Sequence, residues 1–74
     1  MNMFLSEMQE KDVISLVNGQ CYGHIVDAQV DNKGQIISFI AVDKNIFRKI
    51  KNTEITFTYS NINKIGKDVI LIDV

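Results

Sequence analysis

The residue types best suited to chemistry lie in one short stretch, where Cys21, His24 and Asp27 follow one another at intervals of three. A thiol, an imidazole and a carboxylate are components of nucleophilic and metal-binding sites. The surrounding pattern is that of a strand, on which residues 21 and 24 point to opposite faces unless Gly23 forms a bulge. A metal site also needs three or four ligands, and the chain has one cysteine and one histidine. We therefore expect a packed thiol and a rim histidine, with no catalytic residue, no metal and no cofactor.

The other aspartates do not suggest catalysis either. Most lie at the ends of expected strands, where turn residues are common. They are Asp12, Asp31, Asp43, Asp68 and Asp73. They are too scattered to propose a carboxylate pair, so we expect a protein that is not an enzyme.

A cluster of positive charge lies in residues 44–51. It combines Lys44, Arg48, Lys49 and Lys51 with Ile46, Phe47 and Ile50. One interpretation is a solvated loop that keeps the domain soluble. Another is a contact surface, in which the apolar side chains anchor a protein partner and the cations steer its approach. Binding of RNA or a ribosome is a third, but it needs stacking aromatics, and Phe47 is the only aromatic in the cluster.

These residues must be positioned by a fold rich in strands. Ser6 and Gln9 predict a capping box on a short N-terminal helical turn. Alternating or β-branched runs predict strands over residues 11–17, 20–30, 35–42, 54–59 and 68–73, with a turn-rich connection at 61–66. The pattern indicates a small, strongly bent β-barrel of five to six antiparallel strands.

Glycines mark the expected turns and bends. Asn18 and Gly19 form a two-residue hairpin signal, because both tolerate positive φ. Gly34 is expected in a left-handed conformation, Gly23 at a bulge or bend, and Gly66 in the last connection.

The expected third strand is apolar on both faces. Ile37, Phe39 and Ala41 lie on one face, and Ile36, Ile40 and Val42 lie on the other. Such a strand is either central to the core or presents a face that needs a partner.

The length and the net charge of the chain limit the classes of function that it can have. The 74 residues favour one domain over residues 1–74, and so small a core makes a homodimer a fair expectation. The net charge of −1 argues against a strong electrostatic hold on nucleic acid or on anionic membranes. The start lacks a signal-peptide pattern, no apolar run is long enough to span a bilayer, and there is a single cysteine. We expect a cytoplasmic protein without membrane insertion.

In order and spacing, several motifs resemble the PRC-barrel superfamily, most closely its small stand-alone YlmC/YmxH type of sporulation-associated proteins. The resemblance rests on Leu5-Ser6-Glu7-Met8, Lys11-Asp12-Val13-Ile14, Asn18-Gly19, Gly23-x-Ile25-x-Asp27, the turn from Asp31 to Gly34, Glu54-Ile55, and Ile62-x-x-Ile65-Gly66-x-Asp68-Val69-Ile70-Leu71. The chain departs from the family pattern at Glu10, Thr58 and Tyr59, and in its Lys-rich segment before the fourth strand.

The resemblance implies a compact, bent β-barrel that acts as an adaptor or scaffold. Other PRC-barrels serve as adaptors in a photosynthetic reaction-centre subunit and in a ribosome-maturation factor. In the family pattern, Asp27 lies where a carboxylate accepts backbone N–H bonds at a strand bend, which makes it a structural residue. The expected partner is an unidentified protein, and sporulation is the implied setting.

Overall fold

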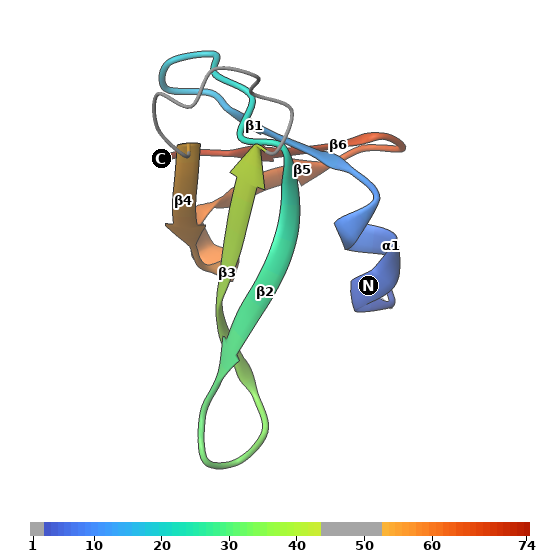
Figure 1. The fold of residues 1–74 in the computed structure, drawn as a ribbon, viewed down its shortest axis with the longest axis vertical. Helices are drawn as coiled ribbons and strands as arrows, with labels where there is room; N and C mark the ends of the chain where they lie inside the picture. Colours follow the sequence, from blue (N-terminus) through green and yellow to red (C-terminus); the bar gives the residue numbers. More distant parts are fainter. Residues whose placement is uncertain (1–2, 44–52) are drawn as a thin grey trace.

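A computed structural model describes residues 3–43 and 53–74 of the chain (Figure 1). In chain order the elements are α1 (Leu5–Gln9), β1 (Asp12–Ser15), β2 (His24–Val30), β3 (Ile36–Asp43), β4 (Thr53–Phe57), the 3₁₀ turn η1 (Tyr59–Asn61), β5 (Ile62–Ile65) and β6 (Val69–Ile72). The strands form a first sheet in the order β1-β6-β5 and a second in the order β2-β3-β4. The predicted all-β class with a short N-terminal helix is confirmed, although the strands of residues 3–43 and 53–74 form two separate sheets and no closed barrel.

One pairing differs from the predicted antiparallel arrangement. β1 pairs with β6 in parallel, with Ile14 opposite Leu71, while the other strand pairs are antiparallel. A parallel pair needs a long connection between its strands, and here the whole second sheet lies within that connection. The pairing therefore brings the first and last strands of the domain together.

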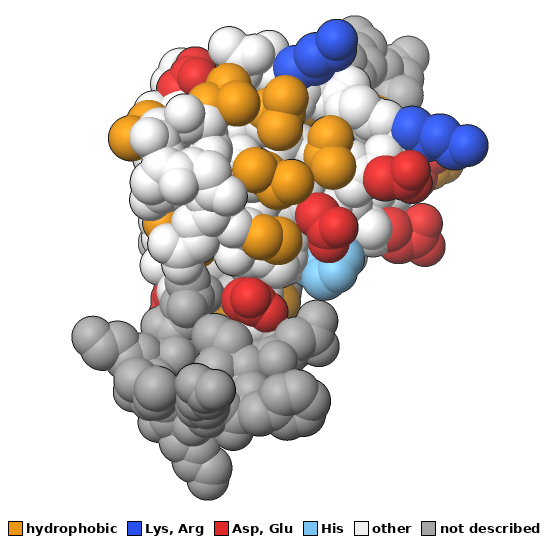
Figure 2. Space-filling view, turned by 90° about the horizontal axis from the view of Figure 1, so that it is seen from above, with side chains coloured by type: hydrophobic (Ala, Val, Ile, Leu, Met, Phe, Trp, Pro, Cys, Tyr) orange, Lys and Arg blue, Asp and Glu red, His pale blue; other side chains and the backbone are white. Residues whose placement is uncertain are grey.

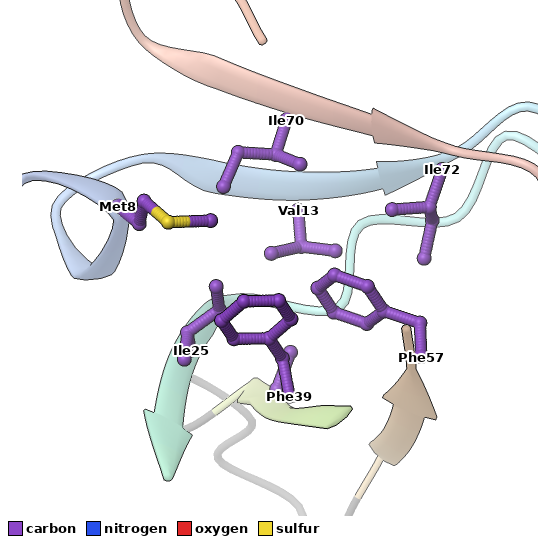
Figure 3. Packing of buried hydrophobic residues seen from close by; sticks show 8 residues of the cluster. Met8, Val13, Ile25, Phe39, Phe57, Ile70 and Ile72 are labelled. Atoms are coloured by element: carbon purple, nitrogen blue, oxygen red, sulfur yellow. The ribbon is translucent and has the colours of Figure 1, made fainter. Parts of the chain in front are cut away.

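The core lies between the two sheets, where side chains from both converge (Figure 3). Its fully buried members include Val13, Phe39, Ile70 and Ile72, each 0% exposed. Phe39 also packs against Phe57, with ring centroids 5.5 Å apart. β3 is central in its sheet, which is one of the two arrangements that its doubly apolar pattern predicts.

The predicted capping box was placed wrongly. The helix begins at Leu5, and the backbone N–H of Phe4 donates to Glu7 Oε1 at 2.9 Å. Ser6 lies inside the helix and does not cap it. Glu7, at the third helical position, accepts from the Phe4 N–H, so the N-terminal cap lies at Phe4, two residues before the predicted cap at Ser6.

Residues 61–66 contain a strand that the sequence pattern did not predict. The pairing of β5 with β6 has an irregularity between Ile62 and Lys64, which makes Asn63 an extra residue in the strand. Ile62 and Ile65 therefore both lie opposite buried residues of β6 although they are three positions apart. A bulge of this kind hides the two-residue period on which strand prediction depends.

The connection after β1 is wider than the predicted two-residue turn. Gly19 has φ 74°, but Asn18 does not have positive φ. The Gly19 N–H donates to Ser15 O at 2.8 Å, and the Asn18 side chain accepts from the Gln20 N–H at 2.9 Å. Asn18 therefore stabilises the turn through its side chain, as in an Asx turn. The second strand also begins later than predicted, at His24, while Cys21 forms an isolated bridge with Ile14.

Candidate functional site

The first sheet presents an apolar face on the side away from the core. Strand side chains alternate, so burial of Val13 and Ser15 turns Ile14 outward. The register places Leu71 beside Ile14 on β6 and Cys21 beside it on the other flank. The residues that define this outer face are Ile14, Leu16, Cys21, Val69 and Leu71. Apolar side chains gather in the corresponding view, with acidic side chains and a histidine to one side (Figure 2).

The outer face keeps part of its apolar surface accessible, most of all at Leu16. Leu16 is 50% exposed, and Ile14, Val69 and Leu71 are half-buried. A sheet that packs on one face normally carries polar residues on the other. This face is therefore unusual for a solvated surface and typical of one that contacts another molecule.

Hydrogen bonds on both sides of β1 hold the outer face in place. The Asp12 N–H donates to Asp68 O, just before β6, at 2.9 Å, and the Leu16 N–H donates to Ile72 O of β6 at 2.8 Å. On the other side of β1, the Val13 N–H donates to Gly23 O at 2.8 Å and the Ser15 N–H donates to Gln20 O at 3.0 Å. Because the backbone is bonded on both sides, the apolar side chains are presented on a pre-organised platform, which lowers the entropy cost of binding.

A polar pair borders the outer face. His24 Nε2 lies 3.3 Å from Asp12 Oδ1, and His24 Nδ1 lies 3.0 Å from the carbonyl oxygen of Lys11. Both side chains are about half exposed, at 46% and 51%. His24 thus pairs with Asp12 on β1 instead of with Cys21 or Asp27. Within residues 3–43 and 53–74, no group of three or more histidine, cysteine or acidic side chains has a metal-binding arrangement.

A groove of about 520 Å³ lies beside β5. Its lining, which we call the β5 groove, consists of Met3, Met8, Tyr59, Ile62, Asn63, Lys64 and Ile65. Tyr59 is 58% exposed and contacts Phe39 edge-on, with ring centroids 5.1 Å apart. The groove therefore joins the core to the edge of the first sheet.

The residues expected at turns and bends lie as follows. Gly23 and Gly34 have positive φ, like Gly19, and Gly66 donates its N–H to Val69 O at the β5–β6 turn. Asp27 Oδ1 accepts from the Ala28 N–H at 2.8 Å, next to a register shift in β2. The predicted contact segment, Lys44 to Lys51, lies outside the described residues.

Prediction from the sequence missed the outer face. The available signal was Val69-Ile70-Leu71-Ile72, four consecutive apolar residues that make β6 apolar on both sides. A doubly apolar strand either lies in the core or presents a face that needs a partner, as for β3. The sequence of β6 does not reveal which strand pairs with it or which of its sides is exposed.

An all-β scaffold with an apolar outer face and a groove at one sheet edge has the features of a binding domain. The PRC-barrel domain family matches residues 1–74, and the chain belongs to this family. PRC-barrel domains mediate protein–protein interactions and are typically not catalytic. A comparison with curated proteins finds no match. In the part of the chain that is described, no helix has the length and hydropathy to cross a membrane.

Proposed function

We propose that this domain is a non-enzymatic adaptor that binds a protein partner through the outer face of the first sheet. The observation that carries the proposal is the row formed by Ile14, Leu71 and Cys21 across a hydrogen-bonded sheet, extended by the half-exposed Leu16. A fixed apolar centre with a polar margin is the usual anatomy of a protein interface.

The outer face supplies binding energy of a useful size. Full burial of a leucine side chain is worth about 1.5–3 kcal/mol, so covering the exposed half of Leu16 contributes about 1 kcal/mol. Further burial of Ile14, Val69 and Leu71 adds to this. Asp12 and His24 at the margin contribute mainly to specificity, because exposed charge pairs add little affinity.

Three further parts of the proposal rest on the sequence. The segment from Lys44 to Lys51 contributes a second contact, anchored by Phe47. The resemblance to sporulation-associated relatives supports a sporulation setting in the cytoplasm. A homodimer would relieve the small core of a 74-residue domain.

RNA or ribosome association is the second candidate function. The observation that favours it is the density of positive charge in residues 44–51, with four cations in eight positions. Such binding neutralises phosphates and weakens steeply as salt rises. Binding to a protein through an apolar face responds far less to salt.

Affinity capture of tagged protein from extract of its native cells, with and without ribonuclease, tests the adaptor proposal. We expect a stoichiometric protein partner that resists ribonuclease and is lost with Leu16→Glu. Val30→Glu is the matched control, because Val30 is also exposed, at 59%, but lies on the β2–β3 hairpin that projects away from the first sheet (Figure 1). Phe47→Glu tests the contribution of the segment 44–51 in the same experiment.

Each outcome separates the candidates. Loss with Leu16→Glu and retention with Val30→Glu supports the outer face. Equal capture by wild type and Leu16→Glu contradicts it. Enrichment that vanishes with ribonuclease favours RNA or ribosome association instead, and unchanged capture by Phe47→Glu removes the segment 44–51 from the interface.

A further inference from the structure

β5 is an open edge of the first sheet. At the opposite side of this sheet, β1 is covered by hydrogen bonds to residues 20–23. Among the described residues, by contrast, β5 pairs with β6 alone. The backbone groups on its outer side form a template for a further strand.

The pairing of the neighbouring residues determines which way the N–H and C=O groups of Ile65 point. The Gly66 N–H donates to Val69 O at 2.7 Å, so Gly66 and Val69 form a hydrogen-bonded pair. Bonded and non-bonded pairs alternate along an antiparallel ladder, which makes Ile65 and Ile70 a non-bonded pair. The N–H and C=O of Ile65 therefore point away from β6, toward the open edge.

The surroundings of this edge specify side chains as well as backbone. On the core side, the β5 groove offers Met3, Met8 and Ile65 as apolar contacts. Lys64 also contributes to the lining of the groove, but it pairs with the outward-facing Leu71, so strand alternation places its exposed side chain on the outer side. An added strand would thus meet an apolar surface on one face and a positive charge on the other, with the period of two that strands have.

The charge of Lys64 discriminates between occupants. Two copies of β5 paired about a two-fold axis would bring their Lys64 side chains close together on one face of the joined sheet. Like charges at neighbouring cross-strand positions are destabilising, and a lysine on an edge strand commonly prevents self-pairing. A strand with an acidic residue at that position gains attraction instead.

We infer that β5 takes up an extended segment of the protein partner as an additional strand, in which apolar residues alternate with acidic ones. The apolar residues enter the β5 groove, the acidic residues lie beside Lys64, and the Ile65 backbone supplies main-chain hydrogen bonds. This inference rests on the proposed adaptor function and names the chemistry of the segment that the domain recognises.

The test uses the full chain and two short capped peptides, one alternating valine with glutamate and the other alternating valine with lysine. We expect the acidic peptide to shift the amide resonances of residues 62–65 and to slow exchange of the Ile65 amide by about tenfold or more at saturation. The acidic peptide should bind up to about fivefold more tightly than the basic one. Lys64→Glu should reverse the preference, whereas Lys33→Glu, the same change in the exposed β2–β3 turn, should not.

Peptides methylated on backbone nitrogen test the pairing itself. Methylating the valine amides and methylating the glutamate amides affect opposite edges of the added strand, so one modification should abolish binding and the other should leave it intact. Absence of Ile65 protection with both peptides overturns the inference, as does a preference that Lys64→Glu leaves unchanged.

If wild type captures a protein partner from the extract and Lys64→Glu captures it equally, strand addition is wrong and the adaptor function stands. If the peptides bind but no protein partner is captured, the adaptor function is wrong, while the preference of the β5 edge for the acidic peptide still stands.

Discussion

At the scale of single residues, Gly23 has the tightest constraint. Its φ of 78° lies in the left-handed region, and an added Cβ would clash with the carbonyl oxygen of Val42 and lie 2.6 Å from the Cα of Asp43. Its own carbonyl oxygen accepts from the Val13 N–H at 2.8 Å. Gly23 therefore connects β1 to the start of β2 at a point where β3 passes too closely for any side chain.

Gly23→Ala should prevent folding or lower the free energy of unfolding by several kcal/mol. Gly34→Ala is the control, because Gly34 has φ 82° with open space around it. That change should cost only about 1–2 kcal/mol for the left-handed backbone. Urea denaturation followed by circular dichroism measures both. Equal losses for the two variants would show that the close approach at Gly23 is unimportant.

Among single residues, the sequence predicts the features that depend on local backbone conformation and misses those that depend on contacts between distant strands. The turn signals at Gly19 and Gly34 are local, and both glycines have the positive φ that the sequence indicates. The pairing of His24 with Asp12 joins residues on different strands, and no local pattern reveals it. The reason for a glycine at position 23, contact with the backbone of β3, is also a long-range property.

At the scale of elements, Ser15 joins three parts of the first sheet. It is 1% exposed, and its Oγ donates to Val74 O at 2.7 Å. The same oxygen accepts from the N–H groups of Val17 and Asn18, at 3.1 Å and 3.3 Å. A single hydroxyl therefore ties the end of β1 to the following turn and to the residue at position 74.

Ser15→Ala should lower the free energy of unfolding by about 1–3 kcal/mol, because it leaves backbone groups around a buried site without partners. Ser6→Ala makes the same chemical change at an exposed position inside α1 and should fall within about 0.5 kcal/mol of wild type. Chemical denaturation with a constant m-value provides the comparison. A large loss for Ser6→Ala would instead restore Ser6 as the helix cap.

The strands themselves were predictable where their alternation is regular. β4 shows this best, since Phe57 is buried while Glu54 and Thr56 are exposed. β5 was not predicted because the extra residue Asn63 disrupts its period. Strand detection from a single sequence thus fails at a bulge, which is also where the candidate docking edge lies.

At the scale of the whole molecule, the parallel pairing of β1 with β6 determines both core and surface. Its inner side contributes Val13, Ile70 and Ile72 to the core, and its outer side provides the proposed binding face. The all-β class followed from the composition and turn signals. The candidate surface did not, because it exists only when strands separated by more than fifty positions lie side by side.

The central claim is that the outer face of the first sheet contacts the protein partner. Methyl NMR of isotopically labelled protein, recorded with and without the captured partner, tests it most directly. We predict that the methyl resonances of Ile14, Leu16 and Leu71 shift on complex formation, while those of Val30 and Ile37 on the β2–β3 hairpin do not. Shifts confined to the hairpin, with unchanged resonances from Ile14, Leu16 and Leu71, would contradict the claim.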